Sequence, residues 1–226
     1  MLGGQLLAAA LLTHSALDLP EHLLPQGTRP TKFLKDSPFV FCTSPHLVAP
    51  APSKTKKQLQ AVLNGNMILF EEAEVLELLK QQDHHHHHHP NIVRYHGCTV
   101  NRGNITGLAL ERYGVMLQYR YEDVPHDLDI AACINGIRAG VKHLHSLGLA
   151  HNDLNPTNIG LDGDDNPIIL DFGSCKKFGE EPLSGGTYGW IDEDYSTSAP
   201  RHDESASDKI EAWLIKEKSE RARSAR

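Results

Sequence analysis

Two short polar motifs, joined by one hairpin, constrain the fold of this chain more than any other feature of its sequence. They are the octet HNDLNPTN at residues 151–158 and the triplet Asp171-Phe172-Gly173. Apolar stretches at 159–161 and 168–170 flank a turn-forming run at 162–166, a pattern that predicts an antiparallel hairpin. Because a hairpin returns the chain to the end from which it started, we expect the octet and the triplet to meet there.

The side chains of these motifs suit phosphoryl transfer, in which a protein mainly positions the reactants and neutralises charge. Such a site needs an acceptor for the proton of the attacking hydroxyl group, and Asp153 suits this part. It also needs oxygen ligands for Mg²⁺, which binds one or two carboxylates together with substrate phosphates. Asn158 and Asp171 supply such oxygens.

The octet, hairpin and triplet, in this order, resemble the catalytic and magnesium loops of eukaryotic protein kinases. The resemblance implies that Asp153 is the catalytic base, and that Asn155 stands where a lysine usually contacts the γ-phosphate of ATP. It implies that Asn158 is a ligand of Mg²⁺ and Asp171 its principal ligand. The residues with a structural part in the site are His151, Phe172 and Gly173.

Further segments resemble the same family. The sequence at 108–114 is similar to the strand and hinge that bind adenine, which implies that Glu111 and Tyr113 contact ATP. The best candidate for the lysine of the N-terminal lobe is Lys35, with Lys32 second. Its partner on the αC helix is expected to be Glu74, and the other candidates for that partner are Glu71 and Glu72. The alternative is that these are ordinary surface residues.

The expected fold is α+β: a bilobal protein kinase-like fold with a reduced N-lobe sheet, an αC helix and a mainly helical C-lobe that stops after the αF helix. A Pro-rich segment at 1–55 can contain N-lobe strands, at 32–34 and 38–42. The kinase-like domain is expected at 56–214, with a His-rich loop at 84–89, and a charged tail at 215–226.

Within that domain, apolar spacing predicts a helical region at 56–82 that Asn64-Gly65-Asn66 interrupts. Strands are expected at 92–95 and 105–111, a helix ending near Gly148, and a last helix at 208–221 that resembles the start of αF at Asp208. Asp164 and Asp165 are expected to be solvated residues of the hairpin turn. The favoured interpretation of Thr187 is a structural hydroxyl near the catalytic aspartate.

The sequence also departs from the family pattern. Asn152 stands where most of these kinases have an arginine that pairs with an activation-loop phosphate, which argues against that mode of switching. No Gly-x-Gly-x-x-Gly sequence occurs, so the phosphate-covering loop of the family is not visible. The neutral Asn155 supplies no positive charge to a phosphate, so transfer is expected to be slower.

Composition limits the other function classes. A net charge of −7 argues against a nucleic-acid binder held by broad phosphate contacts. The four cysteines include no Cys-x-x-Cys pair, which favours free thiols in a reducing compartment. No apolar stretch approaches the roughly 20 residues of a membrane span. We therefore expect no nucleic-acid or membrane partner, and an intracellular, cytoplasmic location.

Three functions remain open at this point. The first is a Ser/Thr protein kinase that uses ATP and Mg²⁺ on a protein substrate that the sequence does not identify; Pro156 favours the Ser/Thr type over the Tyr type. The second is a pseudokinase, a binding module with impaired ATP handling, which the missing glycine loop favours. The third is a small-molecule phosphotransferase of the choline or aminoglycoside kind, against which Phe172-Gly173 speaks.

Overall fold

The protein is described from a computed structural model, in which the described residues are 39–42, 56–82, 88–101, 104–123, 126–182, 184–192 and 196–224. Lys35 and the strand expected at 32–34 lie outside these residues, as does most of the His-rich loop. The chain divides into two compact units, which we describe separately. Unit 1 comprises Met1–Ala73 and Arg94–Arg112, and unit 2 comprises Glu74–Val93 and Tyr113–Arg226.

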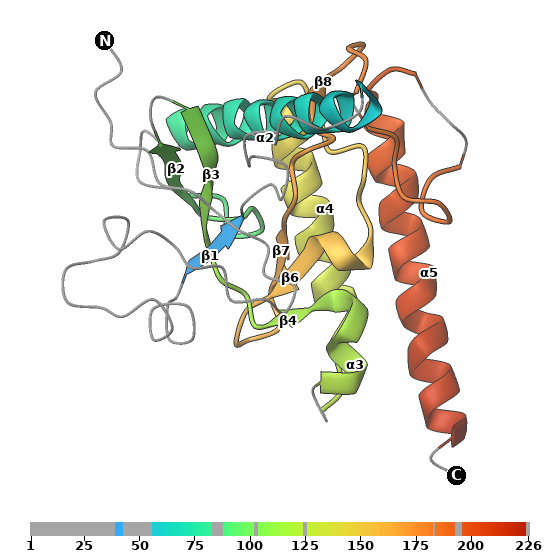
Figure 1. Ribbon diagram of the computed structural model, residues 1–226. Coiled ribbons are helices and arrows are strands. Elements are labelled where there is room, and N and C mark those ends of the chain that lie inside the picture. Colours follow the sequence, from blue (N-terminus) through green and yellow to red (C-terminus); the bar gives the residue numbers. More distant parts are fainter. Residues whose placement is uncertain are drawn as a thin grey trace, which may run out of the picture. The chain divides into compact units, whose positions relative to one another are not determined.

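Unit 1 contains an antiparallel sheet of three strands in the order β1-β3-β2, formed by β1 (Phe39–Cys42), β2 (Tyr95–Asn101) and β3 (Asn104–Glu111) (Figure 1). Buried apolar residues of the two longer strands include Cys98 and Leu108, which face each other in the register. The strand expected at 92–95 begins only at Tyr95, because Ile92 forms an isolated parallel bridge with Ile169 instead.

The helix α2 (Lys56–Gln82) is continuous and passes from unit 1 into unit 2. The prediction that residues 64–66 interrupt it is therefore wrong. A glycine inside a helix costs only about 1 kcal/mol relative to alanine. The residues on either side are mostly good helix formers such as Leu, Lys, Gln and Glu, and a helix of this length can absorb that cost.

Unit 2 is built around the helix α4 (Ile130–Ser146). Its apolar face agrees with the spacing of apolar residues in the sequence, and a side chain caps its first turn. Asp129 caps the helix by accepting a hydrogen bond from the backbone N–H of Ala132. One face packs against the hairpin of β6 (Ile159–Leu161) and β7 (Pro167–Ile169), where Gly140 allows a close approach: a Cβ atom there would lie 2.8 Å from Ile169 Cδ1. The buried apolar residues of α4 are Cys133, Ile134, Ile137, Val141 and Leu144.

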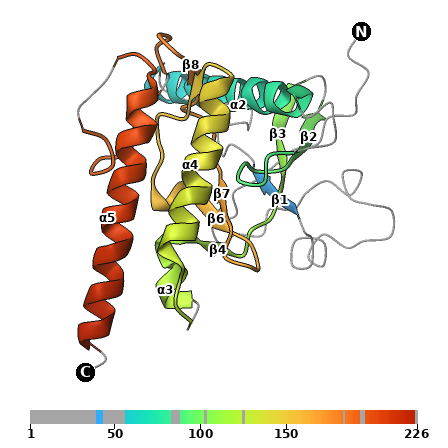
Figure 2. The same ribbon diagram turned by 180° about the vertical axis from the view of Figure 1, so that it is seen from behind.

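The second long helix of unit 2, α5 (Pro200–Ser224), lies beside α4 and runs in the opposite direction (Figures 1 and 2). It begins eight residues before the predicted start at Asp208, so that prediction is wrong. Proline is well suited to the first position of a helix because its missing N–H group has no intrahelical partner there. The negative charge of Asp203 in the first turn also stabilises the helix, because it interacts favourably with the positive N-terminal end of the helix dipole.

Short elements complete unit 2. The strand β4 (Val115–Met116) pairs with β6, and β5 (Leu149–Ala150) pairs with β8 (Lys176–Lys177). The 3-10 helices η2 (Leu117–Tyr119) and η3 (Pro156–Asn158) and the short helix α3 (Arg120–Asp123) lie between the longer elements. With its helices and small antiparallel sheets the chain has the predicted α+β composition. In the described part of the chain no helix is long and apolar enough to cross a bilayer.

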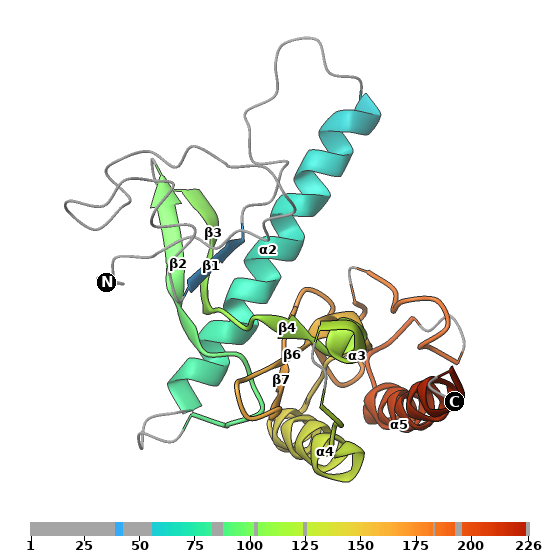
Figure 3. The same cartoon turned by 90° about the horizontal axis from the view of Figure 1, so that it is seen from below.

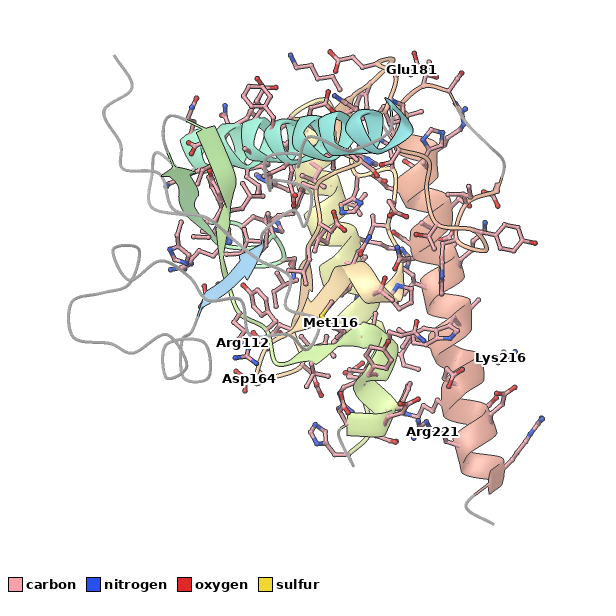
Figure 4. All side chains as sticks on the ribbon, viewed as in Figure 1. Arg112, Met116, Asp164, Glu181, Lys216 and Arg221 are labelled. Carbon is pink, nitrogen blue, oxygen red and sulfur yellow. The ribbon has the colours of Figure 1, made fainter. Side chains whose placement is uncertain are left out.

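An ion pair ties α3 to the turn of the β6–β7 hairpin. The guanidinium of Arg120, whose side chain is fully buried, donates to both carboxylate oxygens of Asp165 at 2.7 and 2.6 Å. This hydrogen bonding holds the pKa of Asp165 below its usual range. The expectation that Asp165 is solvated is therefore wrong, whereas its neighbour Asp164 is exposed as expected; Figure 4 labels Asp164 at this turn.

Candidate functional site

The backbone of the octet is fixed by one buried carboxylate. Asp203, which is 0% exposed, accepts hydrogen bonds from the backbone N–H groups of His151 (2.8 Å) and Asn152 (2.9 Å). Its Oδ2 also accepts from Nε2 of His145, at the end of α4, at 2.9 Å. A buried carboxylate needs such donors to offset its desolvation. The start of α5 therefore positions the loop at residues 151–158.

His151 connects the loop to the segment that follows the hairpin. Its Nδ1 accepts from the backbone N–H of Asp153 at 3.3 Å, which leaves Nε2 to donate to the carbonyl oxygen of Leu170 at 2.9 Å. The imidazole ring also packs against the Phe172 ring, with 5.3 Å between centroids, and both residues are completely buried. The two motifs that the hairpin separates in sequence thus touch through His151.

Asp153 is half-buried, and its two carboxylate oxygens have different surroundings. Oδ1 accepts from both the backbone N–H and the hydroxyl group of Thr187, each at 2.7 Å, and from Nδ2 of Asn155 at 3.3 Å. Oδ2 has a long contact of 3.3 Å with Nδ2 of Asn158. A carboxylate oxygen has two lone pairs, so Oδ2 keeps capacity to accept the proton of a hydroxyl group. The contact of Thr187 agrees with its interpretation as a structural hydroxyl near this aspartate.

Asn155 is 1% exposed, and its side chain forms hydrogen bonds with other residues of the loop. Its Oδ1 accepts from the backbone N–H of Thr157 and so caps η3. Its Nδ2 donates to the carbonyl oxygen of Asp153 at 3.1 Å and to the hydroxyl of Thr187 at 3.2 Å. In this arrangement Asn155 orients Asp153 and Thr187 relative to each other.

Asn158 and Asp171 come together through the hairpin. The backbone N–H of Leu170 donates to the carbonyl oxygen of Asn158 at 2.9 Å, which holds the residue before Asp171 beside η3. Nδ2 of Asn158 donates to the carbonyl oxygen of Asp153 at 2.9 Å, so its amide oxygen is the atom left for a ligand. Asp171 is exposed and has a left-handed backbone conformation (φ 58°), and its Oδ1 accepts from the backbone N–H of Gly173.

This donor set fits Mg²⁺ better than a transition metal. Among the described residues no three His, Cys, Asp or Glu side chains gather into a cluster that could hold a metal. One carboxylate and one amide oxygen leave most positions of an octahedral ion to phosphate oxygens and water, which is how Mg²⁺ is usually bound beside a nucleotide.

Asn152, which stands where the resemblance predicts an arginine, forms a buried network of hydrogen bonds. Its backbone is left-handed (φ 63°), a conformation that asparagine tolerates better than most residues. Its Nδ2 lies 3.0 Å from the carbonyl oxygens of Ala150 and Ser174 and from the hydroxyl of Ser198, and its Oδ1 accepts from Nδ1 of His202 at 3.0 Å. These contacts join residues on both sides of the Asp171 turn to the start of α5.

The residues predicted to bind ATP lie in both units. In unit 1, Glu111 ends β3 and its carboxylate pairs with Arg94 at 3.3 Å. In unit 2, Tyr113 packs on β6, where a Cβ atom on Gly160 would meet its side chain at 2.9 Å. Glu74 is exposed, whereas Glu72 is 9% exposed, so Glu72 is the more buried candidate for the αC glutamate. Lys35 lies outside the described residues.

Sequence reasoning missed the part that Asp203 has in this site. The available signal was Pro200, because a proline followed closely by an acidic residue is typical of a helix start. No local pattern indicates that the Asp203 carboxylate is buried against residues 151 and 152, since that contact joins segments about 50 residues apart.

The sequence of this chain is similar to those of known proteins. The family model described as the protein kinase domain matches residues 54–198. The serine/threonine-protein kinase/endoribonuclease IRE1 of Hypocrea jecorina is 36% identical over 121 residues, which is 45% of this chain and 10% of that protein. The serine/threonine-protein kinase/endoribonuclease IRE2 of Homo sapiens is 33% identical over 117 residues (45% and 12%). The cysteine-rich receptor-like protein kinase 10 of Arabidopsis thaliana is 42% identical over 72 residues (28% and 11%). The matched part of this chain thus spans about a tenth of the length of each relative.

Proposed function

The chain belongs to the protein kinase domain family, and from this premise we propose that it transfers the γ-phosphoryl group of ATP to serine or threonine hydroxyls of a protein substrate, with Mg²⁺. The observation that carries the proposal is the environment of Asp153. One of its carboxylate oxygens is held by two 2.7 Å hydrogen bonds from Thr187, and the other keeps acceptor capacity. A general base needs such a fixed orientation and a free lone pair.

Each residue of the site has a separate role in the proposed reaction. Asp153 Oδ2 accepts the proton of the substrate hydroxyl as its oxygen forms the new bond to phosphorus. Asn155 and Thr187 keep the Asp153 carboxylate in place. The carboxylate of Asp171 and the amide oxygen of Asn158 are the groups that would hold Mg²⁺. When bound, Mg²⁺ neutralises charge on the phosphates, and ADP leaves with the electrons of the broken P–O bond.

A phosphotransfer assay tests the proposal. The protein is incubated with γ-labelled ATP, Mg²⁺ and a degenerate mixture of Ser- and Thr-containing peptides. Because removal of a general base typically costs 10²- to 10⁴-fold in rate, Asp153→Asn should lose about 100-fold or more while it still binds nucleotide. Asp164→Asn, a change of an exposed carboxylate at the hairpin turn, is the matched control and should keep full activity. Equal transfer by wild type and Asp153→Asn would refute the assigned base.

The second candidate function is a pseudokinase, a binding module that keeps the kinase fold but handles ATP poorly. The absence of a Gly-x-Gly-x-x-Gly sequence and the neutral side chain at position 155 favour it. The same assay distinguishes the two functions, because a wild-type pseudokinase would transfer no label to the peptides.

A further inference from the structure

One face of α5 contacts the segment that touches the catalytic aspartate. Ser205, Lys209 and Trp213 are spaced four residues apart, so they lie one above the other on the same side of the helix. The segment at 184–192 runs beside the first turns of this helix (Figures 1 and 3). We call these three residues the α5 face.

The contacts between the α5 face and the segment involve two residues of the segment. The carboxylate of Asp192 pairs through Oδ1 with Nζ of Lys209 at 2.7 Å, and its Oδ2 accepts from the hydroxyl of Ser205. The ring of Trp190 meets the ring of Trp213 edge to face, with 6.0 Å between centroids. A charged contact and an aromatic contact thus hold the same end of the segment.

The middle of the segment reaches the site. The backbone N–H of Trp190 donates to the carbonyl oxygen of Thr187 at 3.0 Å, which closes a turn between them. Thr187 in turn donates to Oδ1 of Asp153 through both its backbone N–H and its hydroxyl group. A continuous path of contacts therefore leads from Lys209 and Trp213 to the catalytic carboxylate.

We propose that the α5 face is a positioning site: Lys209 and Trp213, with Ser205, hold Asp192 and Trp190 so that Thr187 stays bound to Asp153. None of these three residues is placed to touch the reacting atoms, so each acts through the segment. In its catalytic consequence the proposal rests on the proposed function, since the oriented carboxylate matters to turnover only if Asp153 is the base. The holding of the segment itself is independent of that function.

The chain offers a spectroscopic test, because its two tryptophans are Trp190 and Trp213. Intrinsic tryptophan fluorescence therefore reports on this contact without background from elsewhere. Lys209→Glu places a negative charge against Asp192 and should separate the rings. We expect a red shift of the emission and stronger quenching by acrylamide than in the wild type. The charge swap Asp192→Lys with Lys209→Glu should restore most of the wild-type quenching.

The matched control is Lys216→Glu, the same charge reversal on the same helix. Lys216 is 68% exposed and pairs with Glu220 at 3.8 Å; Figure 4 labels it on α5. This variant should leave both emission and quenching unchanged. If Lys209→Glu also leaves them unchanged, or if the control changes them as much, the α5 face does not hold the segment and the proposal fails.

A kinetic measurement tests the positioning role. Since exposed ion pairs and single aromatic pairs are weak contacts, Lys209→Glu should lower kcat for the peptide mixture by about 3- to 10-fold. It should leave the KM for ATP unchanged, and the charge swap should recover kcat. An equal change in kcat and in nucleotide affinity would indicate a general structural effect and overturn the positioning role. An inactive wild type would refute the proposed function, and the fluorescence comparison would then decide whether the α5 face holds the segment.

Discussion

The loop at residues 151–158 and the segment at 184–192 both contribute to the hydrogen bonding of Asp153, but they are held in place by different means. The polar residues of the loop are buried: His151, Asn152 and Asn155 are each at most 2% exposed. The backbone N–H groups of His151 and Asn152 donate to the carboxylate of Asp203, which is itself buried. The segment, by contrast, is largely exposed, and the side chain of Tyr188 in its middle is 96% exposed.

This difference predicts which region tolerates change. A buried polar group that loses its partner incurs the full desolvation penalty of that group, whereas an exposed group exchanges its partner for water. We therefore expect the conformation of the loop to be fixed in the folded state. The segment should be able to change its conformation at little cost in the free energy of unfolding. We expect changes in the loop to cost more stability than changes in the segment.

The largest effect is expected for Asp203→Asn. An amide oxygen can accept only part of the donors that now meet the carboxylate, and its NH₂ group would oppose a backbone N–H. The free energy of unfolding should fall by about 2–4 kcal/mol in urea denaturation, as expected for a buried charged group that loses its hydrogen bonds. Amide hydrogen exchange at His151 and Asn152 should become faster.

Asp208→Asn is the control for this change, because it alters an acidic residue of the same helix that is 74% exposed and pairs with Arg138. Its cost should stay below about 1 kcal/mol. Equal losses in the two variants would show that burial does not distinguish the loop from the surface.

An intermediate effect is expected at the hairpin turn for Asp165→Asn, since Asp165 is 23% exposed while its partner Arg120 is fully buried. The loss in the free energy of unfolding should be about 1–3 kcal/mol at neutral pH. Because its bonds to Arg120 lower the pKa of Asp165, this stability is present above the ordinary range of aspartate. It should be lost as pH falls below about 4 and through the lowered pKa.

Denaturation curves of wild type and Asp165→Asn over a series of pH values check this dependence. The difference between the two proteins should narrow toward acid pH. A difference that stays constant down to low pH would mean that the Arg120 contact does not depend on the charge of Asp165.

The smallest effect on stability is expected for Thr187→Val, in the exposed segment. The variant loses the hydroxyl bonds to Asp153 and Asn155 but keeps the backbone N–H bond. The free energy of unfolding should change by less than about 1 kcal/mol, because water can replace an exposed hydroxyl contact. A loss as large as that of Asp203→Asn would contradict the contrast between loop and segment.

The same contrast explains what the sequence could predict. The octet, the hairpin and the triplet depend on local pattern and neighbouring residues, and the structure brings His151, Asn158 and Asp171 to one end of the hairpin as expected. The chemistry assigned to these residues stays a prediction. The apolar face of α4 also followed from periodicity, and the α+β composition followed from the family resemblance.

What the sequence could not predict depends on contacts between distant segments. The continuity of α2 through Gly65 depends on the helix propensities of the whole helix. The ion pair of Asp165 depends on Arg120, a partner 45 residues away. The contact of Asp203 with the loop could not be predicted for the same reason, and the start of α5 at Pro200 was not predicted either. Local propensity predicts the helices and strands. The buried polar groups that bond to the loop can be identified only from the folded structure.

The central claim is that the Asp171 and Asn158 end of the hairpin holds Mg²⁺ with ATP, and thermal unfolding tests it most directly. A ligand at 100 times its Kd stabilises a protein by about 2.7 kcal/mol, which raises Tm by several degrees in a chain of this size. ATP should therefore raise Tm of the wild type and of Asp164→Asn in Mg²⁺ but not in EDTA, and Asp171→Ala should show no shift. A wild type whose Tm is unchanged by ATP with Mg²⁺, or an Asp171→Ala variant that responds like the wild type, would contradict the account.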